Sequence, residues 1–246
     1  MTDTLNIRIN PGASLEHHPI NEHYSAWVAD DFLLNPEDVI AHAELQRDRF
    51  ESPHRGYPGE VLDLQPINFP EVTRFVRRQM SSLFSFARID IEDSCQVSLT
   101  TQQPEKFSWI QRLPHTDHRR TAGKDNFALL VYLFEDPDFG GTGFFRYRDE
   151  QFWQTMAPKQ FENPDGGLDL VQTRYPMFLE PATYPYESNE AFELITQVPA
   201  RFNRMICYSG DVPHSACIPD AGLLTEDCRN GRLTLNSFAA VWPKNS

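Results

Sequence analysis

Two segments in the first third of the chain carry apolar residues at helical spacing. The first follows the residues 35–38, where an N-cap asparagine, a proline and two acids favour a helix start, and it continues to Phe50. The second follows Pro70, where apolar residues recur at three- and four-residue steps from Val72 to Leu83 and arginines fall between them. The pattern predicts two helices whose apolar faces lie against a sheet.

From Cys95 onward the hydrophobic period changes from helical spacing to two. Cys95, Val97 and Leu99 alternate with polar residues, which is typical of a strand with one buried face. Four further segments have the lengths and patterns of strands: 127–134, 142–148, 202–208 and 232–241. Helices followed by many short strands predict an α+β fold built on an antiparallel sandwich or barrel.

The stretch between Asp149 and Pro199 differs in texture, because it is rich in prolines, aromatic residues and acids. A connection of this length is more often a lid or a binding segment than an idle loop, although it can carry small helices. We therefore expect one domain over 1–246, with helical support in 1–92, a β core in 93–242 and an insertion or lid at 149–199. The aromatic residues of the insertion can equally form a homodimer contact.

Composition narrows the class of protein. The chain has 246 residues and a formal net charge of −13, which would repel a phosphate backbone, so nucleic acid is not an expected partner. The N-terminus has no signal-peptide pattern, and the longest apolar run is far shorter than the ~18 residues that span a bilayer. The 4 cysteines are widely spaced, which favours free thiols. We expect a cytoplasmic protein without a membrane partner.

Candidate metal chemistry begins with His115 and Asp117. The two residues are two positions apart, so on an extended backbone both side chains point to the same face and can bind one ion. Chance alone produces such a pair in a chain of this length. A surface histidine near an aspartate would therefore be the simpler interpretation if the pair stood alone.

Two later residues favour a metal site over a chance pair. His214 follows an apolar strand and a Gly-Asp turn, and Arg232 opens an alternating strand on whose inner face Thr234 also lies. An arginine that faces a barrel interior needs an anion, because its planar guanidinium pairs with a carboxylate and is costly to bury alone. That anion is either a structural Asp or Glu or a bound ligand.

The order of these motifs resembles the Fe(II)- and 2-oxoglutarate-dependent dioxygenase superfamily, in particular its prolyl 4-hydroxylase-like branch. The likeness runs from Cys95 to Trp242. Its parts, in chain order, are the strand 96–101, His115-Thr116-Asp117, the apolar strand ending at Leu133, the turn Gly140-Gly141 into Phe144-Phe145, the strand 203–208, Gly210-Asp211, His214 and Arg232-Leu233-Thr234-Leu235.

The resemblance implies a double-stranded β-helix (jelly roll, cupin-like) with N-terminal helices packed on its larger sheet. It makes His115, Asp117 and His214 the ligands of Fe(II), with 2-oxoglutarate and O2 as cosubstrates. Arg232 is expected to bind the distal carboxylate of 2-oxoglutarate, and Thr234 and Tyr132 are expected beside it. The stretch from His214 to Arg232 is longer than in many members, which leaves Arg229 as the fallback.

The implied activity is hydroxylation of an amino-acid, peptide or other small organic substrate, with release of succinate and CO2. Asp117 fills the carboxylate position, which disfavours the halide-binding variant of the family. Two alternatives stay open: a non-catalytic barrel of the same fold that serves as a binding module, and a metal-dependent dioxygenase that does not use 2-oxoglutarate. Arg232 distinguishes the 2-oxoglutarate-dependent hydroxylase from the dioxygenase that does not use 2-oxoglutarate, because only the hydroxylase needs a buried cation for the cosubstrate.

Overall fold

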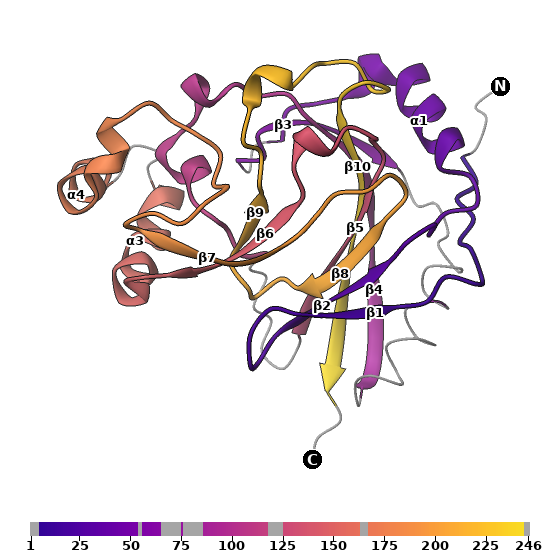
Figure 1. The fold of residues 1–246 in the computed structure, drawn as a ribbon, viewed down its shortest axis with the longest axis horizontal. Helices are drawn as coiled ribbons and strands as arrows, with labels where there is room; N and C mark the ends of the chain where they lie inside the picture. The colour runs from indigo at the N-terminus through magenta and orange to yellow at the C-terminus, as the bar shows by residue number, and fades with distance from the viewer. Residues whose placement is uncertain are drawn as a thin grey trace.

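The computed structural model describes residues 5–53, 56–64, 75, 86–117, 125–162 and 167–243. Their fold is a mixture of helices and antiparallel sheets (Figure 1). Its α-helices with defined bounds are α1 (Pro36–Leu45), α3 (Glu150–Glu162) and α4 (Leu168–Arg174). Short 3-10 helices include η1 (Arg47–Arg49), η2 (Pro104–Lys106), η3 (Trp109–Arg112), η4 (Pro137–Phe139), η5 (Pro176–Leu179) and η6 (Ala221–Leu223).

The large sheet has seven strands in the order β1-β2-β8-β5-β10-β4-β3. All its neighbouring strands are antiparallel. Its members are β1 (Glu16–Pro19), β2 (Ser25–Ala29), β3 (Gly59–Leu64), β4 (Phe86–Thr100), β5 (Asp125–Tyr132), β8 (Met205–Ser209) and β10 (Arg232–Pro243). The strands predicted near Cys95 and over 127–134, 202–208 and 232–241 are all confirmed as members of this sheet.

A second sheet has three strands in the order β7-β6-β9. They are β6 (Thr142–Tyr147), β7 (Phe192–Val198) and β9 (His214–Ala216). Phe144 of β6 is the register partner of His214, so this sheet carries one of the predicted metal ligands.

The two faces of the large sheet are buried by different partners. On one face, Val97, Leu233 and Leu235 share an apolar core with Val39 and Ile40 of α1. On the other face, a second core joins large-sheet residues such as Tyr132 and Tyr208 to Phe144 and Val198 of the small sheet. This arrangement confirms that the first predicted helix packs on the larger sheet. Arg232 and Thr234 alternate with Leu233 and Leu235 along β10. They therefore lie on the opposite face, which points toward the small sheet.

The second predicted helix, after Pro70, lies almost entirely outside the described residues. Phe75 is the exception: it is helical and 4% exposed, and its ring centroid is 5.1 Å from that of Phe32.

The N-terminal part corrects the expected division of the chain. Residues 1–92 were expected to supply helical support to a β core that begins at residue 93, yet β1, β2 and β3 are strands of the large sheet and β4 already begins at Phe86. The sequence Glu16–Pro19 is polar and its side chains are largely exposed, because β1 is an edge strand. Such a strand has no buried face, and it therefore shows no alternating hydrophobic signal.

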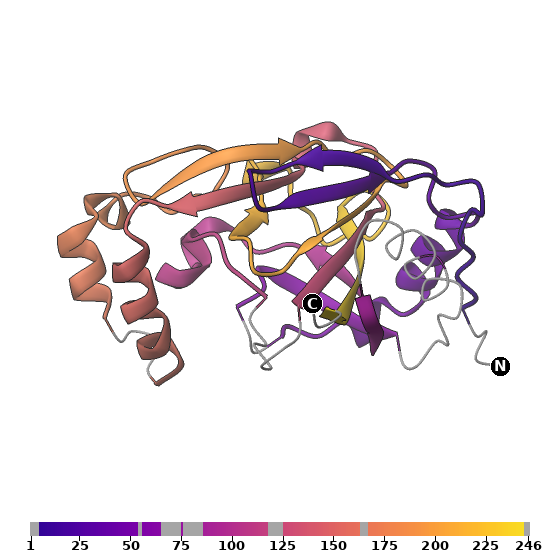
Figure 2. The same cartoon turned by 90° about the horizontal axis from the view of Figure 1, so that it is seen from below.

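The segment 149–199 is also more structured than an inserted loop. Helices α3 and α4 lie side by side at the end of the molecule away from α1 (Figures 1 and 2). Its last part, β7, pairs with β6 and so belongs to the small sheet. The expected insertion therefore extends too far: only the part before β7 lies outside the two sheets.

Two expectations from composition can be compared with the described residues. Cys95, Cys207, Cys217 and Cys228 are all buried free thiols. Among the helices of the described residues, none has the length and apolar character needed to cross a membrane.

Candidate metal centre

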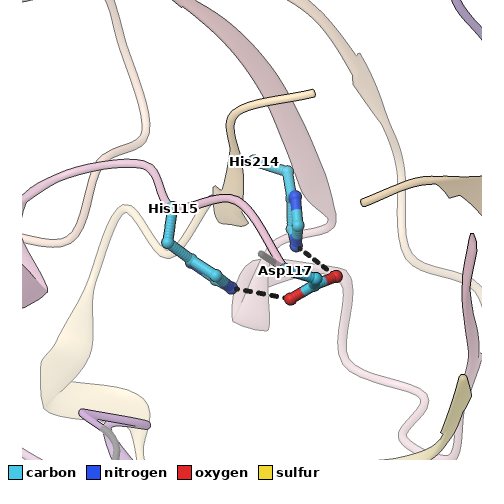
Figure 3. A group of neighbouring side chains, drawn as sticks. All are labelled: His115, Asp117 and His214. Atoms are coloured by element: carbon cyan, nitrogen blue, oxygen red, sulfur yellow. Dashed lines mark ion pairs between the residues drawn. The ribbon is translucent and has the colours of Figure 1, made fainter. Parts of the chain in front are cut away.

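His115, Asp117 and His214 lie together in the structure although they come from separate segments. Their ligand atoms all fall within 4.8 Å of one another. His115 Nε2 is 3.7 Å from Asp117 Oδ1, and His214 Nε2 is 3.4 Å from Asp117 Oδ2 (Figure 3). Each imidazole Nε2 thus faces a different oxygen of one carboxylate, and the three predicted ligands lie close enough to share one ion.

Backbone hydrogen bonds bring these segments together. His115 and His214 form an antiparallel bridge, in which each N–H donates to the other's carbonyl at 2.9 and 2.8 Å. The Asp117 N–H donates to the Gly210 carbonyl at 2.8 Å. A Cβ on Gly210 would meet the Asp117 Cβ at 2.8 Å. Glycine is therefore the residue that lets the Asp117 side chain lie against this turn.

His214 is held firmly. Its side chain is 5% exposed, and its Nδ1 lies 2.8 Å from the Val212 carbonyl, to which it can only donate. Nδ1 is then the protonated nitrogen, and Nε2 keeps its lone pair. The Tyr208 ring and the imidazole form a T-shaped contact at a centroid distance of 4.7 Å. Hydrogen bonding of the second ring nitrogen is the usual way in which a protein orients a metal-binding histidine.

His115 is the most exposed of the three residues. Its side chain is 61% exposed, and its ring centroid lies 4.4 Å from that of His214. Desolvation and the neighbouring His214 lower the pKa of His115 against an opposing effect of Asp117, and the exposure of the side chain limits the effect of desolvation. The lowered pKa favours the neutral imidazole, which is the form that binds a metal.

Asp117 provides the observation that tests the fit of a metal. Its Oδ2 is buried, and no residue in the described part of the chain donates a hydrogen bond to it. A buried carboxylate oxygen without a donor is costly unless a cation compensates it. Two neutral imidazoles and one carboxylate are a donor set that suits a first-row divalent ion and leaves one face of it open. The residues present therefore fit such an ion.

Arg232 is buried, 3% exposed, at the start of β10. Its Nε donates to the Phe139 carbonyl at 2.9 Å, and its guanidinium lies 5.4 Å from the centre of the Phe134 ring. Weaker contacts reach the carbonyls of Gly140 and Gly141, at 3.5 and 3.3 Å, and the Thr100 hydroxyl at 3.4 Å. No carboxylate among the described residues forms an ion pair with it. A structural Asp or Glu partner, one of the two explanations for this arginine, is thus not found there.

Tyr132 and Thr234 lie beside Arg232 on the same face of the sheet, where they are register partners on β5 and β10. The Tyr132 hydroxyl is 2.7 Å from that of Thr142. Burial raises the pKa of Tyr132 to about 12, while the Thr142 hydrogen bond and the charge of Arg232 act in the opposite direction. The phenol therefore stays protonated and can donate a hydrogen bond at neutral pH.

Arg229 occupies a different environment. It lies on the surface, where its guanidinium forms ion pairs with Glu37 at 3.0 Å and with Glu44 at 2.7 Å, both on α1. The structure thus separates the two arginines considered for the cosubstrate: Arg229 has carboxylate partners outside the sheets, and Arg232 lies buried between them.

Several residues that shape the metal centre were not found by sequence reasoning. Val212 orients His214, and the Tyr147 hydroxyl donates to the carbonyl of Pro114, which precedes His115. The Gly-Asp turn before His214 was a usable signal for Gly210. The others act through a backbone carbonyl or through a contact between distant segments, and neither leaves a pattern in the sequence.

Comparisons with known proteins give one family and several distant structures. A family model described as "Family of unknown function (DUF6445)" matches residues 11–239. A search of curated proteins found no match. HygX from Streptomyces hygroscopicus, solved with nickel and 2-oxoglutarate, is 13% identical, with 89% of this chain and 83% of HygX covered and a TM-score of 0.44.

A Pseudomonas putida prolyl-4-hydroxylase is 10% identical, with 95% of this chain and 94% of the hydroxylase covered and a TM-score of 0.40. Both TM-scores lie below 0.5. The function of this chain must therefore be inferred from its own side chains and not from these two similarities.

Proposed function

The chain belongs to the DUF6445 family, whose function is unknown, and we propose that it is a non-haem Fe(II)- and 2-oxoglutarate-dependent oxygenase. The observation that carries the proposal is the convergence of His115, Asp117 and His214, with a buried Asp117 oxygen that has no donor in the described part of the chain. His214 lies on β9 of the small sheet, and His115 and Asp117 lie on the segment bridged to it, in what we propose to be a double-stranded β-helix. Bound iron, with 2-oxoglutarate and O2, would supply an oxidant able to remove hydrogen from a C–H bond, with release of succinate and CO2.

In this proposal the chain's own residues hold and orient the reactants. His214 presents Nε2 because Val212 fixes its other nitrogen, and Asp117 supplies the negative charge. Three protein ligands leave three positions of an octahedral ion open, and a fourth would block one of them. The exposed side of His115 lets small molecules reach that open face.

Arg232 supports 2-oxoglutarate over other cosubstrates. It is a buried cation without a carboxylate partner among the described residues, so an incoming dicarboxylate would supply the missing anion. Tyr132 and Thr234 offer hydroxyl groups on the same face of the sheet. A metal-dependent dioxygenase that does not use 2-oxoglutarate gives no reason for a cation at this position. The proposed organic substrate remains an amino acid, a peptide or another small molecule.

One experiment tests the proposal directly. Fe(II) and 2-oxoglutarate are added to the protein without oxygen, and the visible charge-transfer band of the chelate is recorded; succinate is then measured after exposure to air. We expect both signals from the parent protein and neither from the Asp117→Ala variant. A parent protein that gives no band and no succinate, and behaves like Asp117→Ala, would contradict the oxygenase and favour a binding module of the same fold.

A further inference from the structure

The two histidines of the candidate metal centre are supported in different ways. His214 lies on β9 and has a hydrogen bond to its second ring nitrogen. His115 lies outside the named strands, and no described residue forms a hydrogen bond with its second ring nitrogen. Its backbone is joined to His214 by one bridge. Besides its contacts with Asp117 and His214, the position of His115 therefore depends on what holds the residues just before it.

Tyr147 holds the chain at the residue before His115. It ends β6, and its hydroxyl donates to the Pro114 carbonyl. Burial raises the pKa of Tyr147 above its ordinary value, so the phenol keeps the proton that it donates. The Tyr147 ring packs in turn on Trp153 of α3, at a centroid distance of 5.7 Å. Trp153 stacks on Tyr175, with ring centroids 5.2 Å apart and an interplanar angle of 14°.

Arg112 makes a second, separate connection, which joins the segment before His115 to η5. It ends η3, three residues before His115. Its Nη2 donates to the Met177 carbonyl at 2.7 Å and its Nη1 to the Phe178 carbonyl at 3.1 Å, both in η5. The guanidinium also lies 4.9 Å from the centre of the Phe178 ring. Because the fork of an arginine fixes direction as well as distance, this contact orients the end of η3.

Apolar packing joins the two connections into one support. Leu113, 6% exposed, lies in the same core as Trp153, Tyr175 and Phe178. The helical residues 150–162 and 167–179 thus pack against the segment 112–115 and are hydrogen-bonded to it through η5. A segment that is fixed by a buried core is poorly suited to open and close as a lid.

We propose that Tyr147 and Arg112 are positioning residues for His115, and that the helical residues 150–162 and 167–179 support the metal centre through them. This inference rests on the proposed metal site. Neither residue touches the ion; each sets the backbone from which His115 reaches it. Removing an outer partner of a metal ligand typically weakens metal binding by about 10- to 100-fold.

The test measures metal binding and not turnover. Co(II) is titrated into the full chain without 2-oxoglutarate, and its visible absorption gives both the Kd and the ligand-field spectrum. Tyr147→Phe keeps the ring on Trp153 and removes only the hydroxyl. Tyr184→Phe is the matched control, because its buried hydroxyl also donates to a backbone carbonyl, that of Gln102 at 2.7 Å, on a segment without a ligand.

We expect Tyr147→Phe to bind Co(II) about tenfold more weakly, with an altered spectrum, and Tyr184→Phe to match the parent. Arg112→Lys, which keeps the charge and loses the fork, is expected to act like Tyr147→Phe and serves if that variant does not fold. Equal Kd values and spectra in the parent, Tyr147→Phe and Arg112→Lys would overturn the inference and leave the proposed oxygenase intact. Equal weakening in Tyr147→Phe and Tyr184→Phe would also overturn it, since the cause would be general stability. A parent protein that binds no Co(II) would overturn the metal centre itself.

Discussion

Gly210 and Asp117 lie in direct contact: the Asp117 N–H donates to the Gly210 carbonyl at 2.8 Å, and a Cβ on Gly210 would stand 2.8 Å from the Asp117 Cβ. No side chain accepts a contact that short with another Cβ, so a methyl group at this position must displace the aspartate. The turn before His214 therefore contributes to the metal centre without supplying a ligand.

The first prediction arises from this contact. Gly210→Ala should weaken Co(II) or Fe(II) binding by about 10- to 100-fold, since the carboxylate moves relative to the two imidazoles. Metal titration followed by absorption measures the change. The control is Gly12→Ala, because a Cβ at Gly12 would meet only the Asn10 side-chain oxygen, at 3.3 Å. If Gly210→Ala bound metal as tightly as Gly12→Ala, the contact would have no bearing on the site.

The second prediction separates the two candidate arginines. Arg232→Lys keeps a positive charge but loses the planar fork, so the 2-oxoglutarate concentration needed for half-maximal succinate formation should rise at least about tenfold. Co(II) affinity should stay within about twofold. Arg229→Lys should leave both values unchanged, because that side chain pairs with Glu37 and Glu44 on the surface. A raised requirement in Arg229→Lys alone would transfer the role to Arg229.

Much of the sheet and of the candidate site could be predicted because the signals are local. The alternation around Val97 and from Arg232 onward gives the strand and its inner face without any tertiary information. His115, Asp117 and His214 were a prediction from the order of motifs, and the structure confirms that they lie together. Their role as iron ligands stays a prediction.

Other parts could not be predicted because they depend on contacts between distant residues. β2 is identified by its pairing with β8, where Ala26 is opposite Tyr208. β7 was assigned to the insertion because it lies in the stretch rich in prolines, aromatic residues and acids; in the structure its side chains are mostly half-buried, with no clear alternation of buried and exposed positions. Arg229 and Arg232 are the same residue type three positions apart, and only packing shows that one is on the surface and the other between the sheets.

The third prediction concerns stability and pH. Asp30, after β2, accepts from Arg204 Nε at 2.6 Å and from Arg201 at 2.7 Å, near the start of β8. The hydrogen bond from Arg204, together with the charges of Arg204 and Arg201, lowers the pKa of Asp30, although burial opposes the shift. A lowered folded-state pKa stabilises the protein above the unfolded-state value of about 3.9, and this stabilisation is lost as the pH falls through the folded-state value.

Asp30→Asn should therefore lower the free energy of unfolding by about 1 kcal/mol at pH 7, a discounted figure for a partly exposed pair. The difference between variant and parent should shrink as the pH falls below about 4, where the parent aspartate takes up a proton. Urea unfolding at a series of pH values measures it. A difference that stayed constant down to the lowest pH, or grew there, would show that the charge of Asp30 is not what stabilises the β2–β8 end of the sheet.

The last prediction concerns the cysteines. Burial raises the pKa of Cys207 and of Cys217 to about 12 and that of Cys228 to about 11, and it also raises the pKa of Cys95. Only the thiolate reacts quickly with a disulfide reagent, so at pH 8 the native protein should expose less than about one reactive thiol over several minutes. After unfolding in guanidinium without reductant, all 4 cysteines should react. Fewer thiols in the unfolded sample would reveal a disulfide, and rapid reaction of the native protein would show that the regions around these thiols open far more readily than their burial implies.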